Sequence, residues 1–188
     1  MSERIAKTAP LIDVRSPRDY LDRVIRTQLL NAVNEGMLAV GPHEISRHVR
    51  IDDQSKQVPP DTHAADLVGG RRNNKRREAL ADLRTPDGGW LSFSAVLRPK
   101  DGKVEVVAYN VERVYRRDDC PHWIRFDFSP PGHDNDQRGM RSHVHPGDDD
   151  LQLPAPIFAP HELIALLLDP PGPSDTRKPR AKGEVERP

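Results

Sequence analysis

Residues 90–115, WLSFSAVLRPKDGKVEVVAYNVERVY, carry the clearest strand pattern of the chain. At the start of this stretch, Leu91, Phe93, Ala95 and Leu97 alternate with Ser92 and Ser94, a period of two that is typical of a half-buried β-strand. Pro99-Lys-Asp-Gly then predicts a turn, and residues 103–115 predict a second strand. Because a short turn joins strands that run in opposite directions, this stretch predicts an antiparallel sheet.

Two further strands are expected downstream of this pair. Residues 122–129, HWIRFDFS, place three apolar side chains on one face of a strand and Arg125 and Asp127 on the opposite face, because neighbouring residues alternate. Residues 140–145 predict a fourth strand. Strands that follow one another through short connections indicate an antiparallel meander with one apolar face.

Helical patterns occur in the sequence both before and after these strand segments. Residues 17–35 carry apolar side chains at helical spacing, with Ser16 as a suitable N-cap and Gly36 at the left-handed position after the last turn. Residues 160–168 predict a short second helix with a leucine-rich face. Together these elements predict an α+β fold, with an antiparallel sheet of four or five strands and helices packed on one face.

The chain is expected to form a single α+β domain over residues 1–168. Residues 1–86 would form its mainly helical N-terminal part, and residues 87–168 its sheet and C-terminal helix. Residues 169–188 are rich in proline and charge and have almost no apolar side chains, so they are expected to be a disordered tail.

Three N-terminal segments are harder to assign. Residues 43–51 fit either a short helix or a strand. Residues 52–63 are polar, contain Pro59-Pro60 and predict a loop. Residues 71–84 fit a helix from about Asn74 onward.

The composition narrows the class of protein. The 188 residues contain 29 basic and 29 acidic side chains, so no global positive charge indicates nucleic-acid binding. Cys120 is the only cysteine, which excludes an internal disulfide and a cysteine-based zinc site. Because the N-terminus lacks the apolar run of a signal peptide and no segment fits a membrane span, we expect a cytoplasmic protein without a membrane partner.

The candidate active site combines Arg125 and Asp127 with His143 and His145. The residues of each pair are two apart, so they share one face of their strand, and pairing of the two strands would bring all four together. Asp127, His143 and His145 are then candidates for acid–base catalysis, and the two histidines could instead bind a metal ion together with Asp127 or His133. The plainer interpretation is that they are solvent-facing strand residues that form cross-strand ion pairs.

Of these chemistries we favour metal-free acid–base catalysis on a phosphodiester, and we expect no cofactor. Arg125 and Arg141 would hold phosphate and stabilise the transition state, with His133 as a further substrate contact. Such a cationic neighbourhood disfavours a divalent cation. The segment 148–150, three aspartates, argues the other way because it could bind a hard cation, although a solvated acidic loop is the plainer interpretation.

A short basic cluster lies outside this site, with five basic side chains in the seven residues 71–77. In a neutral protein such a cluster can bind the phosphates of a nucleic acid. A solvated helix face that is balanced by nearby acidic residues is an equally good interpretation. The candidate nucleic-acid contacts are Arg71, Arg72, Lys75, Arg76 and Arg77.

The order of these features resembles the TumE-like toxins of toxin–antitoxin pairs and related uncharacterised bacterial domains. The resemblance covers about residues 90–168 and departs from the toxin pattern in the longer N-terminal half and in the segment 129–132, Ser-Pro-Pro-Gly. It implies a toxin that acts on RNA or translation and is neutralised by a partner protein, the antitoxin. The matching positions are Arg125, Asp127, His133, His143 and His145.

The sequence therefore predicts a toxin-like or defence-associated nucleic-acid hydrolase, with a metal-independent ribonuclease as the favoured form. The alternative is a non-enzymatic nucleic-acid- or protein-binding subunit of a larger bacterial assembly, in which the basic cluster makes the contacts and the histidines are structural. A metal-dependent enzyme that uses the two histidines is a third hypothesis.

Overall fold

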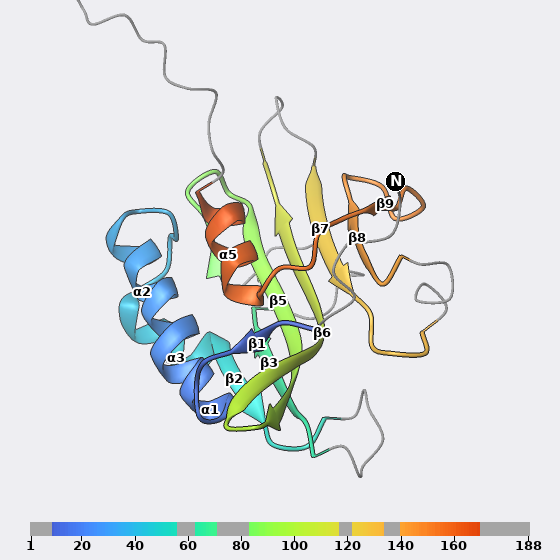
Figure 1. Ribbon diagram of the computed structural model, residues 1–188. Coiled ribbons are helices and arrows are strands. Elements are labelled where there is room, and N and C mark those ends of the chain that lie inside the picture. The colour runs from blue at the N-terminus through green and yellow to red at the C-terminus, as the bar shows by residue number, and fades with distance from the viewer. Residues whose placement is uncertain (1–8, 56–62, 71–82, 117–121, 134–139, 170–188) are drawn as a thin grey trace, which may run out of the picture.

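The computed structural model describes residues 9–55, 63–70, 83–116, 122–133 and 140–169 (Figure 1). These residues form an α+β fold around one antiparallel sheet of nine strands. The α+β class is confirmed, whereas the expected number of four or five strands was wrong. The strands are β1 (Leu11–Ile12), β2 (Val49–Asp52), β3 (Ala65–Gly69), β4 (Leu83–Arg84), β5 (Trp90–Lys100), β6 (Lys103–Val114), β7 (Trp123–Phe128), β8 (Ser142–His145) and β9 (Leu153–Pro154).

The long hairpin of β5 and β6 forms the centre of this sheet. The strand order is β2-β3-β5-β6-β7-β8-β9, while β1 pairs with β6 and β4 pairs with β5. Asp101 and Gly102 form the tip of the hairpin, and both have positive φ angles, of 49° and 76°. The strands predicted from the alternating pattern are therefore present, and β5 extends slightly further into the predicted turn.

The additional strands come mainly from the N-terminal half. β2 and β3 form one edge of the sheet, and every residue of β3 is buried. At the end of β3, Gly69 lies under the ring of Phe93, where a Cβ atom would lie 2.0 Å from the ring. Since β1, β4 and β9 are only two residues long, no sequence period reveals them.

The predicted N-terminal helix is present as α1 (Pro17–Tyr20), a π-helical turn η1 (Leu21–Ile25) and α2 (Arg26–Asn34). Ser16 is its N-cap, because the Ser16 hydroxyl accepts a hydrogen bond from the main-chain N–H of Asp19 at 3.1 Å. Gly36 follows the helix with a φ of 74°. The other helices are η2 (Pro42–Glu44), α3 (Ile45–His48) and α5 (Pro160–Leu168).

Segment 43–51 thus contains both a short helix and the start of a strand. Of the segment 71–84, the structure describes only β4, which is a strand and not the expected end of a helix. The proposed basic cluster, Cys120 and nearly the whole tail lie outside the described residues.

The helices α1, α2 and α5 cover one face of the sheet (Figure 1). Their buried side chains join those of β5, β6 and β7, including Phe126 and Phe128, in one apolar cluster. Arg125 and Asp127 alternate with these phenylalanines and therefore lie on the opposite face. Among the described residues, no helix is long and apolar enough to cross a membrane.

One buried ion pair closes the turn before β5. The Arg113 guanidinium donates to the Asp87 carboxylate at 2.9 Å and to the main-chain carbonyl of Val114. The same Asp87 oxygen accepts from the Thr85 hydroxyl at 2.6 Å and from the N–H of Gly89 at 3.2 Å. Burial alone would raise the pKa of Asp87, but these hydrogen bonds and the Arg113 charge lower it to about 2.

Candidate active site

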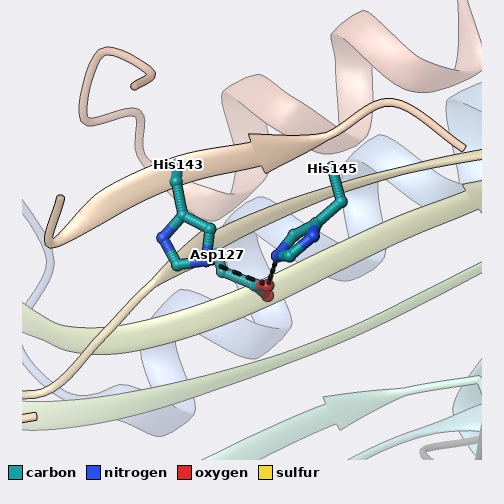
Figure 2. Close-up of side chains that lie close together, drawn as sticks. All are labelled: Asp127, His143 and His145. Atoms are coloured by element: carbon teal, nitrogen blue, oxygen red, sulfur yellow. Dashed lines mark ion pairs between the residues drawn. The ribbon is translucent and has the colours of Figure 1, made fainter. Parts of the chain in front are cut away.

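The strands β7 and β8 bring the two sequence pairs together. In their antiparallel register, Arg125 lies opposite His145 and Asp127 lies opposite His143. The expected pairing of these two segments is therefore confirmed. The imidazole side chains of His143 and His145, both on β8, point toward the Asp127 carboxylate of β7 (Figure 2).

Three side chains converge on one oxygen of Asp127. Its Oδ2 lies 3.2 Å from His145 Nε2, 3.6 Å from His143 Nε2 and 2.9 Å from Arg125 Nε. The two histidines are each 2% exposed, whereas the side chains of Arg125 and Asp127 are 17% exposed. The carboxylate is thus partly open to solvent, while the imidazoles are held in the sheet.

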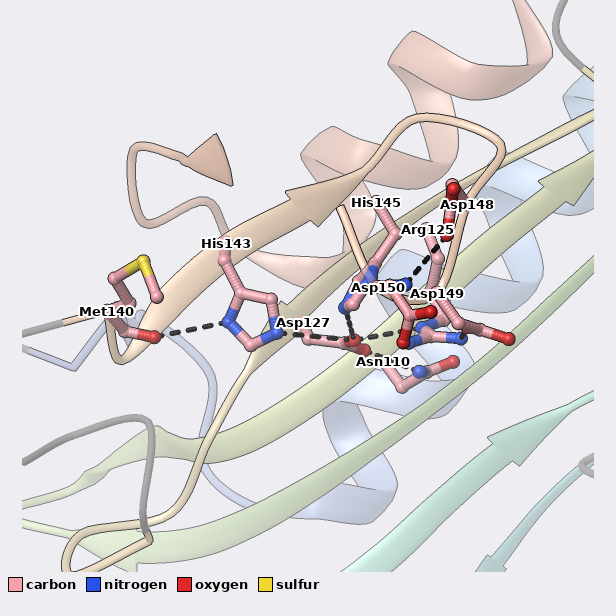
Figure 3. A network of polar contacts seen from close by, with 9 residues as sticks. All are labelled: Asn110, Arg125, Asp127, Met140, His143, His145, Asp148, Asp149 and Asp150. Atoms are coloured by element: carbon pink, nitrogen blue, oxygen red, sulfur yellow. Dashed lines mark hydrogen bonds and ion pairs between the residues drawn. The ribbon is translucent and has the colours of Figure 1, made fainter. Parts of the chain in front are cut away.

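Two further residues complete this network (Figure 3). Asn110 of β6 lies opposite Asp127 and donates from its amide to Asp127 Oδ1. Asp149, on the loop after β8, accepts a hydrogen bond from Arg125 Nη1 at 2.6 Å and is 65% exposed. Arg125 therefore bridges a carboxylate of the sheet and a carboxylate of the loop.

The environment sets the charges of these groups. Burial alone would raise the pKa of Asp127, but the hydrogen bond from His145 and the charge of Arg125 outweigh it and lower that pKa. Burial lowers the pKa of His143 and outweighs the opposite effect of Asp127. Burial also opposes the charge of Arg125, yet Asp127 and Asp149 raise its pKa. The site thus holds an ionised Asp127, a cationic Arg125 and a neutral His143 at neutral pH.

The hydrogen bond of His143 determines which of its ring nitrogens carries the proton. His143 Nδ1 lies 3.1 Å from the main-chain carbonyl oxygen of Met140. A carbonyl only accepts, so Nδ1 carries the hydrogen and the Nε2 of the neutral ring has a free lone pair. His145 differs, because its Nδ1 is buried without a hydrogen-bond partner among the described residues.

The cluster opens into a pocket of about 300 Å³. Arg125, Asp127, His143 and His145 all line it, and so does His133, whereas Asp149 and Gln152 border it from the loop after β8. The structure therefore brings five of the six candidate catalytic and substrate-binding residues to one cavity.

Arg141, the sixth candidate, points elsewhere. Its Nε donates to the carbonyl of Ser129 at 2.9 Å and its Nη2 to the carbonyl of Val107 at 3.2 Å. The guanidinium stacks over the Phe128 ring, 4.2 Å from the ring centroid, and does not line the pocket. The other candidates, Arg71, Arg72, Lys75, Arg76 and Arg77, lie outside the described residues.

Asn110 and Asp149 were not singled out as site residues from the sequence. A signal for Asn110 exists, because it is a polar residue in a long apolar strand and shares a face with Glu112. For Asp149, the three consecutive aspartates drew attention only as a possible cation ligand. Nothing in their order indicates which one reaches Arg125.

The arrangement supports two kinds of chemistry. Two imidazoles and a carboxylate in one pocket can transfer protons to and from a bound substrate. The same three residues each offer a ligand atom within 4.8 Å of the others, which is a spacing that one metal ion can bridge.

The resemblance to TumE-like toxins stays a prediction, because no family model matches the chain and neither a curated protein nor a solved structure matches it.

Proposed function

We propose that this protein is a phosphodiester hydrolase that acts on nucleic acid, with RNA as the favoured substrate. The observation that carries the proposal is the convergence of His143, His145 and Arg125 on Asp127 at the wall of an open pocket. A purely structural ion pair does not need two histidines that face a cavity. This pocket would bind the phosphodiester group whose bond to the 5′-oxygen is cleaved.

The residues of the site can divide the work of RNA cleavage without a cofactor. His143, neutral at its Nε2, takes the proton from the ribose 2′-hydroxyl, whose oxygen attacks the phosphorus. His145, paired with Asp127, gives a proton to the departing 5′-oxygen, so that a 2′,3′-cyclic phosphate and a 5′-hydroxyl form. Arg125 offsets the negative charge that builds up on the phosphoryl oxygens.

A toxin-like or defence-associated role, with an antitoxin as protein partner, is proposed from the resemblance alone. The alternative of a non-enzymatic binding subunit is kept as an outcome of the test, since its basic contacts lie outside the described residues.

The test is cleavage of a fluorescently labelled RNA by the full chain. We expect the double variant His143→Ala/His145→Ala to cleave about 100-fold or more slowly than wild type, because acid–base groups typically contribute that much. The variant His43→Ala is the matched control, since it removes an exposed histidine that does not line the pocket. RNA that is bound but left intact by wild type would support the binding subunit, and equal cleavage by all three chains would refute the proposed site.

A further inference from the structure

The charge of the pocket does not suit a phosphate as well as the sequence led us to expect. Among the described residues that line it, Arg125 is positive and Asp127 and Asp149 are negative. These three side chains together carry more negative than positive charge, and a phosphodiester brings a further negative charge. A divalent cation would reverse this balance.

Arg125 and Arg141 do not form the cationic neighbourhood that would disfavour such a cation. Arg141 instead donates to the main-chain carbonyls of Ser129 and Val107 and does not line the pocket, and Arg125 is offset by two carboxylates. No surplus of positive charge therefore repels a metal ion from the described part of the site.

We propose that Asp127, His143 and His145 bind one divalent transition-metal ion through a carboxylate oxygen and two imidazole nitrogens. The binding stands apart from the reaction, and only its role in cleavage rests on the proposed function. Imidazole and carboxylate ligands suit zinc and neighbouring transition metals, whereas magnesium and calcium prefer an all-oxygen environment.

The distances fit this coordination. Ligand atoms bound at about 2.0–2.1 Å to one tetrahedral ion lie about 3.3–3.4 Å from each other. The distances from Asp127 Oδ2 to the Nε2 atoms of His145 and His143, 3.2 and 3.6 Å, lie on either side of this value. Because Oδ2 has two lone pairs, it can accept from Arg125 and bind an ion as well.

The orientation of His143 supports the same conclusion independently. Its Nδ1–H is held by the Met140 carbonyl, which is the usual outer contact of a metal-binding histidine and fixes Nε2 as the ligand atom. At 3.6 Å this Nε2 is too far from Asp127 for a good hydrogen bond. A free lone pair that points at a carboxylate is repelled by it, and an ion between the two atoms removes the repulsion.

Binding of the ion changes what the histidines can do. Once their Nε2 atoms are ligands, they no longer carry protons, so metal-assisted cleavage and imidazole acid–base cleavage exclude one another. The pocket on the open side of Asp127 leaves room for a water molecule or a substrate oxygen as a further ligand, as in catalytic zinc sites.

The test is calorimetric titration of zinc chloride into the chelator-treated full chain, with magnesium chloride as the control ion. We expect one tight zinc site per chain, and at least about 100-fold weaker binding in His143→Gln and in Asp127→Asn. His43→Ala should bind zinc like wild type. Absence of a tight site in wild type, or unchanged binding in both cluster variants, would overturn the inference.

A second measurement covers the case in which a variant does not fold. In the wild-type chain, zinc should shift the ring signals of two of the eight histidines in a nuclear magnetic resonance spectrum. Shifts of other histidines alone would contradict the assignment.

The cleavage assay separates the two proposals. RNA cleavage by the metal-free chain that depends on His143 and His145 would uphold the proposed function and refute the role of metal in it. Tight zinc binding by a chain that cleaves no RNA with any metal would uphold the binding and refute the function.

Discussion

Two of the arginine–aspartate pairs among the described residues use their partners differently. Arg113 and Asp87 are closed: the carboxylate accepts from a hydroxyl, a main-chain N–H and the guanidinium at the end of a tight turn. Arg125 and Asp127 are open: two histidines lie against the same carboxylate oxygen, and a pocket adjoins them. A carboxylate that two histidines share beside a cavity therefore indicates a site better than the charged pair itself.

The sharpest way to break this comparison is to neutralise each aspartate separately. We expect Asp127→Asn to slow RNA cleavage by about 100-fold or more, because it removes the carboxylate on which the cluster converges. Asp87→Asn should leave the cleavage rate per folded molecule unchanged and lower the free energy of unfolding by about 2–3 kcal/mol, since it leaves the buried Arg113 charge uncompensated. Single-turnover cleavage and urea unfolding of both variants provide the measurements.

If Asp87→Asn abolished cleavage without loss of stability, the distinction between a structural and a reactive pair would be wrong.

Acid should weaken the closed pair within a defined pH range. Because the folded-state pKa of Asp87 is about 2, below its ordinary value of 3.8, its contribution to stability is complete above about pH 4 and is lost as the pH falls toward 2. The loss amounts to at most about 2 kcal/mol. The difference in unfolding free energy between wild type and Asp87→Asn should therefore shrink over this range, and a constant difference would speak against the pair.

The smallest expected effect concerns the loop carboxylate of the open pair. Asp149 is largely exposed, so its bond to Arg125 is worth little and a phosphate can displace it. Asp149→Asn should lower the KM for RNA by a factor of about 1.4 to 5, which corresponds to the 0.2–1 kcal/mol of an exposed pair. Asp150→Asn makes the same charge change on the same loop, and an equal effect there would mean that only the overall charge matters.

Much of the central sheet could be predicted from sequence because its residues alternate. The period of two in β5 and in β7 indicated the strands, and the same period placed Phe126 in the core and Arg125 on the other face. β3 was missed, because a short apolar run that ends in Gly69 has no period and its strand character comes from pairing with β2 and β5. The two-residue strands β1, β4 and β9 are strands only because they pair with β6, β5 and β8.

The candidate site, like the sheet, could be predicted from the sequence only in part. The spacing of Arg125 with Asp127 and of His143 with His145 indicated the four central residues, because strand geometry puts each pair on one face. The register of β7 with β8 then brings the two pairs together. Arg141 was assigned to phosphate binding from its position in sequence, but its guanidinium donates hydrogen bonds to main-chain carbonyls instead. The contacts of Asn110 and Asp149 depend on register and on the path of a loop, which no local pattern encodes.

The open carboxylate of Asp127 and the two histidines are expected to form one ligand site. A crystal structure of the full chain soaked in zinc chloride, with data collected at the zinc absorption edge, would locate the ion. We predict an anomalous difference peak about 2.0–2.2 Å from His143 Nε2, His145 Nε2 and a carboxylate oxygen of Asp127. A fully ordered cluster with no peak between these three side chains, while zinc occupies other histidines, would contradict the account.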